Sequence, residues 1–250
     1  MGHAVFRQQN GLMAVGIVAA CGLITPQQLK GVAELAEPLG IAGFKLSTRQ
    51  TLIAVLPEEK MPDLETEVDK LGLRIGSFGE VVRNVKACCG TSGFCVRSQA
   101  DAHQLGLRLQ DRFMDEPVPK DFKISVAGCQ RGCTDPFCAD FGCIGNPARV
   151  RGGFDVIIGG RGGSRRPRHG QRILESVSPD TVERALAYVL DRYRALGQPH
   201  ERLCHTIDRV GLSAFIPPRE LLDGQEEAAA GREDGAPVDA DFLNFAASER

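Results

Sequence analysis

Seven of the nine cysteines lie in two short stretches, and their spacing predicts a metal site. Five residues separate Cys89 from Cys95, and three separate Cys129 from Cys133. A cytosolic chain keeps its thiols reduced and uses clustered cysteines for metal binding or catalysis. Four thiolates on two glycine-containing loops suit an iron–sulfur cluster, because a bulky cluster needs the room that residues without a Cβ atom leave.

The cysteine pattern leaves several alternatives open. Structural zinc more often uses cysteine pairs separated by two residues, and the sequence has no such pair, so an iron–sulfur cluster is favoured over zinc. The neighbouring Cys88 competes with Cys89 for the role of first ligand. Cys138 and Cys143 are either buried thiols or ligands of a second metal. The two isolated cysteines lie in apolar patterns and are expected to be small buried side chains: Cys21 and Cys204.

A run of arginines forms a second candidate binding segment. Residues 161–169 contain Arg161, Arg165, Arg166 and Arg168 and no acid. Such a run is usually a solvated surface or a nucleic-acid patch. Aromatic residues make up only 6% of the chain and Trp is absent, which argues against base stacking. The glycines at 159–163 do not form the G-x-G-x-x-G pattern that opens a helix, so we expect no nicotinamide site.

The elements that position these residues are predicted to form two α+β units. In the first, residues 12–20 are strand-like, and Thr25-Pro26 begins a helix whose apolar spacing continues to Gly40. Short strands are expected at 44–46 and 51–56, followed by a helix over 62–71. The order strand, helix, strand, strand, helix, strand is that of a ferredoxin-like unit.

The second unit is predicted to carry the cysteines. We expect a helix over 98–113, strands over 122–127 and 154–158, and a long helix from Ser178 to Leu196. The strand over 122–127 leads directly to Cys129. The expected domains are residues 1–80 and 81–216. Residues 217–250 are expected to form an acidic, flexible tail with a short docking patch at Phe242, Leu243 and Phe245.

The composition is that of an ordinary globular protein, with 42% hydrophobic and 25% charged residues. Residues 220–250 carry nine acids against two arginines, so the preceding body is basic although the formal net charge is −2. The longest apolar stretch, residues 12–24, is too short to cross a membrane. The N-terminus lacks the features of a secretory signal, so a cytoplasmic location is expected.

Taken together, these motifs resemble the sulfite and nitrite reductases that carry sirohaem and a 4Fe–4S cluster. The resemblance spans residues 11–215 and rests on these segments: 83–95, 126–133, Thr48-Arg49-Gln50 and 155–160. It implies a ferredoxin-like half domain over 1–80 and a sirohaem- and 4Fe–4S-binding α+β domain over 81–216. It also implies the cluster ligands Cys89, Cys95, Cys129 and Cys133, with Cys133 bridging to the sirohaem iron. A glycine usually follows the family's first cysteine by two residues, which selects Cys88 and keeps that alternative open.

The same resemblance implies cationic contacts, because sirohaem carries carboxylates and the substrate is an anion, and guanidinium groups suit both. The implied active-site residues are Arg49, Arg83, Lys120 and Lys123. The implied cofactor contacts are Thr48, Arg49, Gln50, Arg131, Arg161, Arg165, Arg166 and Cys133. Asp121 stands where the family's second lysine is expected, so Lys120 is an imperfect substitute for it.

The resemblance implies a reductase that passes electrons through the cluster to an anion on the sirohaem iron. Sulfite reduction to sulfide is the first expectation and nitrite reduction to ammonia the alternative. No flavin or nicotinamide domain is recognisable, so a ferredoxin-like donor is expected. Larger family members contain two related halves, so we expect a homo-oligomer or a partner subunit, with no nucleic-acid or membrane partner. Two other classes remain: a non-catalytic iron–sulfur electron-transfer subunit and a zinc-stabilised nucleic-acid binder.

Overall fold

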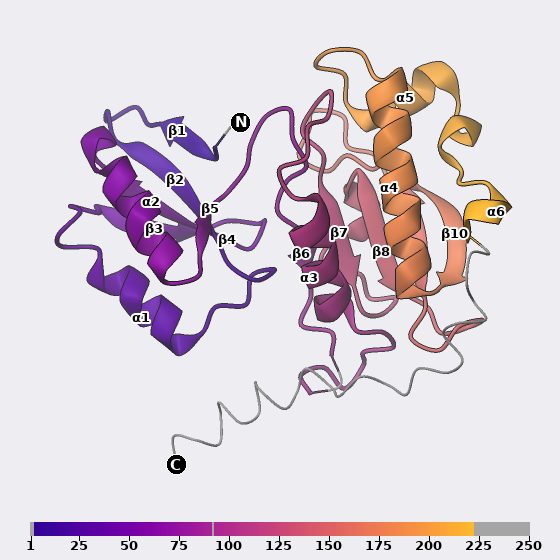
Figure 1. Cartoon of the computed structure of the whole chain (residues 1–250), viewed down its shortest axis with the longest axis horizontal. Helices are drawn as coiled ribbons and strands as arrows, with labels where there is room; N and C mark the ends of the chain where they lie inside the picture. The colour runs from indigo at the N-terminus through magenta and orange to yellow at the C-terminus, as the bar shows by residue number, and fades with distance from the viewer. Residues whose placement is uncertain (1–2, 92, 223–250) are drawn as a thin grey trace.

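Two α+β units lie side by side in the computed structural model, which describes residues 3–91 and 93–222 (Figure 1). Each unit consists of one sheet with helices packed on it. The predicted α+β class is confirmed, whereas the exact domain boundaries stay predictions.

The first unit has an antiparallel sheet in the order β1-β2-β4-β3, with β5 also paired to β2. Its elements are β1 (Val5–Arg7), β2 (Met13–Val18), α1 (Pro26–Glu34), β3 (Gly43–Leu46), β4 (Thr51–Leu56), α2 (Met61–Lys70) and β5 (Arg74–Ile75). From β2 to β5 the order is the predicted ferredoxin-like one. Strand β1 is an addition that the sequence analysis missed.

Helix α1 begins as predicted and ends earlier. Thr25 accepts the backbone N–H of Gln28 at 3.1 Å, and the Gln28 side chain accepts the N–H of Thr25 at 3.0 Å, which completes a capping box. The helix ends at Glu34, and turns continue to Gly40. Pro38 accounts for the early end, because a proline disfavours helical backbone in the residue before it and offers no N–H of its own.

The second unit has a mixed sheet in the order β10-β9-β8-β7-β6, in which β6, β7 and β8 are parallel. Its elements are β6 (Lys86–Ala87), α3 (Ala102–Phe113), β7 (Ile124–Ala127), β8 (Phe141–Gly145), β9 (Phe154–Ile158), β10 (Gln171–Val177), α4 (Pro179–Leu196), α5 (Leu203–Val210) and α6 (Arg219–Leu222). The predictions of strands at 122–127 and 154–158 and of a helix over 178–196 match β7, β9 and α4. Strands β6, β8 and β10 and helix α5 were missed.

Helix α3 begins at Ala102 instead of the predicted Ser98. Asp101 caps it by accepting the N–H of Gln104 at 2.9 Å. The N–H groups of Gln99 and Ala100 instead donate to the carbonyl of Gly128, at 2.8 and 3.1 Å. The segment before α3 is therefore hydrogen-bonded to the loop that carries the second cysteine pair and does not extend the helix.

Helices α3 and α4 cover one face of the second sheet, and the short 3-10 turn Pro136–Cys138 packs on the other. Helices α3 and α4 lie on the same side of this sheet (Figure 1). Ile124 and Val126 of β7 belong to the core that includes the α3 and α4 side chains. Because side chains alternate along a strand, Ser125 lies on the opposite face.

The described chain extends beyond the predicted boundary at residue 216. Residues 219–222 form α6, and Arg184 donates hydrogen bonds to the carbonyls of Leu221 and Leu222, both at 3.1 Å. The remainder of the predicted acidic tail, with its docking patch at 242–245, lies outside the described residues. Among the helices of residues 3–91 and 93–222, none is long and apolar enough to cross a membrane.

Candidate functional site

Two glycines bring the two cysteine loops together. Gly90 directly follows Cys89, and Gly128 directly precedes Cys129. A Cβ atom on Gly90 would lie 3.1 Å from the Cα atom of Gly128, which is tighter than nine in ten real Cβ contacts. The N–H of Cys88 also donates to the carbonyl of Val126 at 3.0 Å. The segments that carry the two cysteine pairs therefore lie against each other, as a shared cluster requires.

The thiols of these loops differ in their surroundings. Cys88 is half-buried, and its sulfur accepts the backbone N–H of Gly128 at 3.2 Å. Burial raises the pKa of the Cys88 thiol, and the N–H groups of Gly128 and Gly90 oppose that rise. Cys89 and Cys133 are exposed, whereas Cys95 and Cys129 are partly buried. Of the adjacent thiols Cys88 and Cys89, Cys88 is thus the one whose sulfur is positioned by a backbone hydrogen bond.

The described residues contain no group of three or more His, Cys, Asp or Glu side chains placed around a single metal ion. An iron–sulfur cluster is an extended inorganic body, so its cysteine ligands stand farther apart than the ligands of one ion. Five thiols on two touching loops and the glycines that give them room fit such a cluster.

The remaining cysteines are separate from these loops. Cys21 and Cys204 are buried, as predicted. Burial raises the pKa of Cys21 to about 12. Cys143 is buried in β8, and burial raises its pKa well above the ordinary range, which is typical of an inert core thiol. Cys138 is partly buried and lines a cavity.

That cavity, here called the cationic cavity, has a volume of about 250 Å³ and lies between the two units. It lies on the face of the second sheet opposite α3 and α4, where Ser125 contributes to its wall. Three of its lining side chains are cations, Arg49, Lys86 and Lys123. The other lining residues are Thr48, Ser125, Asp135, Cys138, Ala139, Gly162 and Gly163. A small anion meets mainly positive charge in this space.

Arg49 reaches the cavity from the turn between β3 and β4. Its guanidinium donates to the carbonyl of Asn84, and the Asn84 amide donates back to the Arg49 carbonyl at 3.1 Å. Its buried Nε–H has no partner among the described residues. Burial, followed by the charge of Arg83, lowers the pKa of Arg49 to about 10, so it stays charged at neutral pH.

Gln50 holds this turn against the second unit. Its side-chain amide donates to the carbonyl of Ala87 at 2.6 Å and accepts the N–H of Ala87 at 3.0 Å. The backbone of Gln50 is left-handed, with φ of 57°. Within the predicted Thr48-Arg49-Gln50 segment, Thr48 and Arg49 line the cavity, whereas Gln50 binds the turn to β6.

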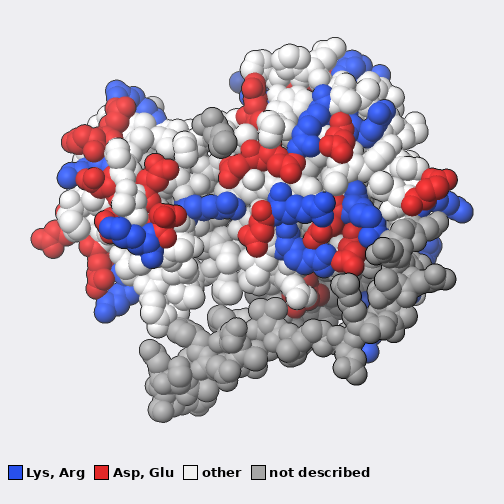
Figure 2. All heavy atoms as spheres, viewed as in Figure 1, with Lys and Arg blue, Asp and Glu red and all other residues white. Residues whose placement is uncertain are grey.

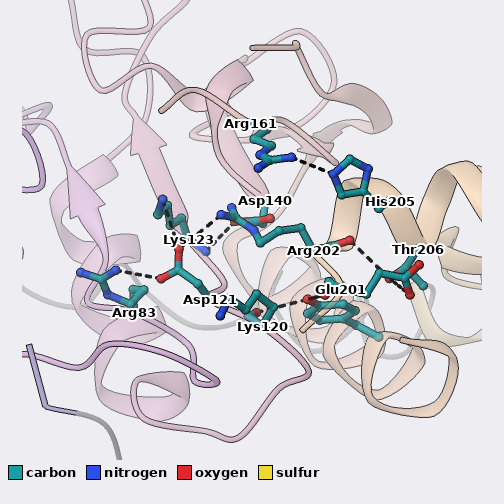
Figure 3. A network of polar contacts seen from close by, with 11 residues as sticks. Arg83, Lys120, Asp121, Lys123, Asp140, Arg161, Glu201, Arg202, His205 and Thr206 are labelled. Atoms are coloured by element: carbon teal, nitrogen blue, oxygen red, sulfur yellow. Dashed lines mark hydrogen bonds and ion pairs between the residues drawn. The ribbon is translucent and has the colours of Figure 1, made fainter. Parts of the chain in front are cut away.

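Arg83 and Lys123 share one carboxylate. Arg83 donates to Asp121 at 2.8 Å, and the Lys123 ammonium lies 3.2 Å from the other Asp121 oxygen (Figure 3). Burial disfavours the charged form of Asp121, but Arg83, Lys123 and Arg202 outweigh it and hold the pKa of this carboxyl below its ordinary value. Arg83 also lines a smaller cavity of about 120 Å³ beside Arg49. Asp121 therefore anchors two of the predicted cations.

The sequence analysis missed two buried members of this network of charged side chains, Arg202 and Asp140. Arg202, at the N-cap of α5, donates to Asp121 at 3.3 Å and to Asp140 at 2.6 Å (Figure 3). Asp140 also accepts the backbone N–H of Lys123 at 2.9 Å, and its other oxygen is buried without a partner among the described residues. The only signal in the sequence was an isolated acid in the apolar run over 137–144.

The other predicted cations lie outside the cationic cavity. Lys120 is not among the lining residues, and its carbonyl accepts the Tyr193 hydroxyl at 3.2 Å. Arg131 is exposed. Arg161 lies 2.7 Å from the ring of His205, and its backbone pairs with Arg168 to close a hairpin. This hairpin places Gly162 and Gly163 on the cavity wall.

The hairpin over 161–168 keeps unused donors near the cavity. The Nε–H of Arg161 is buried and unpartnered among the described residues. Arg165 and Arg166 are exposed, and their guanidinium groups have no ion-pair partner within the described chain. Such donors fit a carboxylate-bearing cofactor.

On the face shown in Figure 2 acidic and basic side chains are interspersed, so this face offers no extended basic surface for nucleic acid.

Gly128→Ala tests the contact between the cysteine loops. A Cβ atom at Gly128 would lie 2.7 Å from the carbonyl oxygen of Ala100, and this backbone atom cannot rotate away. We expect the purified variant to retain less than about half of the wild-type iron, because the loops must separate to admit the methyl group. Gly43→Ala is the matched control, since nothing lies within 4 Å of a Cβ atom there. Equal iron contents in the two variants would contradict this view of the loops.

Comparison with known proteins identifies the family. The model of the nitrite and sulphite reductase 4Fe-4S domain matches residues 78–221. The model of the nitrite/sulfite reductase ferredoxin-like half domain matches residues 6–71. Together they cover both units of the fold.

Among curated relatives, an assimilatory-type sulfite reductase of Nitratidesulfovibrio vulgaris is 26% identical and is matched over 85% of this chain and 94% of its own length. A nitrite reductase [NAD(P)H] of Emericella nidulans is 28% identical over 74% of this chain, which spans only 16% of that protein. The chain thus spans nearly all of one relative and a small part of the other.

Solved structures agree on the fold. Dissimilatory sulfite reductase I has a TM-score of 0.73 at 14% identity, covering 91% of this chain and 73% of that chain. The Mycobacterium tuberculosis NirA protein has a TM-score of 0.69 at 26% identity, covering 85% of this chain and 41% of that chain. The predicted fold and the expected cofactors, a 4Fe–4S cluster and sirohaem, are confirmed at the level of the family. This chain belongs to the nitrite and sulfite reductase 4Fe–4S family.

Proposed function

We propose that the protein is a sirohaem-dependent sulfite reductase. The observation that carries the proposal is the position of the cationic cavity, lined by Arg49, Lys86 and Lys123, against the two strands, β6 and β7, that lead into the touching cysteine loops. A relative of nearly the same length, covered to 94%, is an assimilatory-type sulfite reductase. Both findings support a small anion as the substrate that the enzyme reduces.

The residues of the chain have distinct roles in this proposal. When bound, the cluster would pass on electrons from the external donor, and sirohaem would supply the iron at which the substrate is reduced. Arg49 and Lys123 bind the anion and offset its charge in a partly dry cavity. Arg83 adds positive potential and is held by Asp121. Lys123, as an ammonium, is also able to donate protons as S–O bonds break. Arg161, Arg165, Arg166 and Arg131 are proposed to bind cofactor carboxylates.

The cluster ligands are proposed to be Cys95, Cys129, Cys133 and one thiol of the adjacent pair. The sequence spacing favours Cys89. Cys88 is the thiol that accepts the Gly128 N–H, and backbone N–H groups commonly hydrogen-bond to cluster sulfurs and tune them. We therefore propose Cys88 as the fourth ligand, and the Discussion gives the experiment that separates it from Cys89.

Several features of the whole protein belong to the same proposal. A ferredoxin-like carrier is proposed as the electron donor, and the cytoplasm as the location. A homo-oligomer or a partner subunit is also proposed. Leu46, on the edge strand β3, is 74% exposed, and an apolar edge strand is a common site of association. Analytical ultracentrifugation tests this, and a fully active monomer would count against it.

Nitrite is the second candidate substrate. Relatives of this chain include nitrite reductases, among them an assimilatory ferredoxin-dependent enzyme of Haloferax mediterranei that is 31% identical. The test measures sulfite and nitrite reduction side by side, with the iron- and sirohaem-loaded protein and a reduced dye. Faster turnover of sulfite, with sulfide as product, supports the proposal. Preference for nitrite would replace it with the second candidate, and no turnover of either would leave an electron-transfer subunit.

A further inference from the structure

We propose that Lys86 is the second lysine of the cationic cavity and contacts the substrate anion, the role that the sequence analysis gave to Lys120. The inference rests on the proposed function, because it concerns the anion that this cavity takes. It follows from strand register, burial and charge around Lys86.

Strand register places Lys86 on the cavity face. In the parallel pair of β6 and β7, Lys86 lies opposite Ser125, and Ala87 lies opposite Val126. Ala87 and Val126 belong to the core under the helices. Lys86 and Ser125 consequently point to the other face, and both line the cavity. Lys123, two residues before Ser125, joins them there.

Burial separates Lys86 from an ordinary surface lysine. Only 15% of its side chain is exposed, whereas its partner Asp135 is 73% exposed. The Lys86 Nζ atom lies 3.3 Å from an Asp135 oxygen. An ammonium has three N–H donors, and this contact uses one of them. Lys86 therefore keeps donors for an anion, and Asp135, its one ion-pair partner among residues 3–91 and 93–222, is screened by solvent.

The two competing lysines are differently placed. Lys123 is bound to Asp121, which also neutralises Arg83 and Arg202. Lys120 is absent from the cavity wall. Among the described lining lysines, Lys86 is thus the one whose carboxylate partner is exposed: Asp135 is 73% exposed and screened by solvent, whereas Asp121 beside Lys123 is only 10% exposed.

Asp135 allows a test in the opposite direction. Its backbone is left-handed, with φ of 53°, and asparagine tolerates this conformation well. Asp135→Asn therefore removes the negative charge beside Lys86 without adding backbone strain. An anion then competes with no carboxylate for the Lys86 ammonium.

The experiment measures the KM for sulfite and, by calorimetry, the equilibrium binding of sulfite to the same cofactor-loaded variants. Lys86→Met is expected to raise KM and the dissociation constant about 10- to 100-fold, as loss of a charge-assisted hydrogen bond predicts. Lys86→Arg should restore most of the affinity. Asp135→Asn should lower both constants about two- to fivefold. Lys70→Met, which removes an exposed lysine paired with Glu67, is the matched control.

Each outcome decides the matter. A Lys86→Met variant that melts at the wild-type temperature but binds sulfite like Lys70→Met overturns the inference. So does a Lys120→Met variant with the larger loss of affinity. If wild-type protein reduces neither sulfite nor nitrite, the proposed function fails. The calorimetric comparison of wild-type, Lys86→Met and Asp135→Asn proteins then still decides whether Lys86 binds the anion.

Discussion

Cys133→Ser is expected to abolish sulfite reduction and to remove the visible absorption of the coupled cofactors. Cys133 is an exposed thiol on the loop after β7. We propose, from the family resemblance, that it would hold the cluster beside the sirohaem. A serine hydroxyl is a harder and less acidic ligand than a thiol, so it holds iron poorly. The measurements are iron and acid-labile sulfide per chain, the visible spectrum and turnover with a reduced dye.

Cys143→Ala is the matched control for this substitution. Cys143 is buried in β8 and its side chain belongs to the core under the helices, so its loss should leave the iron content and spectrum unchanged. A spectrum of Cys133→Ser that equals that of wild type would reject the bridging role. Loss of iron in Cys143→Ala would instead indicate a second metal.

The same measurements separate Cys88 from Cys89. We expect Cys88→Ser to lose the cluster and Cys89→Ser to retain it, because the Gly128 N–H already fixes the Cys88 sulfur. The reverse result would establish the ligand favoured by sequence spacing. Retention of the cluster in both single variants would show that the two thiols substitute for each other, and the double variant would then lose it.

Asp140→Ala is expected to lower the free energy of unfolding by about 3–5 kcal/mol, since it leaves the Arg202 guanidinium without its closest partner in the interior. The side chains of Asp140 and Arg202 are only 1% and 14% exposed. Denaturant titration of the purified variant measures the change. Lys70→Ala breaks an exposed pair of 62% and 39% exposure and should change stability by less than about 1 kcal/mol.

A double variant distinguishes an unpaired charge from lost packing. Asp140→Leu combined with Arg202→Met replaces both charges by apolar groups, and it should recover part of the stability lost in Asp140→Ala. If Asp140→Ala changes stability no more than Lys70→Ala does, the buried pair does not hold this part of the fold. Because Asp140 also accepts the Lys123 N–H, the single variant should weaken sulfite binding as well.

The ferredoxin-like unit was predictable because its signals are local. Thr25, Pro26 and Gln28 specify a helix start within four residues, and the strand over 51–56 has the same bounds in the structure. Strand β8 carried no such signal. It contains Gly142 and Gly145, and glycine disfavours strands; here each lies against backbone, with a Cβ of Gly142 only 2.2 Å from the Pro136 carbonyl oxygen.

The site residues likewise fall into those that local sequence signals predicted and those that they did not. Arg49 and Lys123 were found because they lie in recognisable segments, and the structure places both on the cavity. Asp140 and Arg202 are 62 residues apart in sequence, and no local pattern pairs them. Lys86 was missed because its role depends on which face of β6 it occupies, and a two-residue strand gives no periodicity to read.

The most direct test of the central claim is the cofactor content of the wild-type protein, purified without oxygen from cells that make sirohaem. We predict iron with acid-labile sulfide and an extractable tetrapyrrole, together with a visible spectrum that sulfite changes. Protein that contains zinc in place of iron, or iron and sulfide with no tetrapyrrole, would contradict the account.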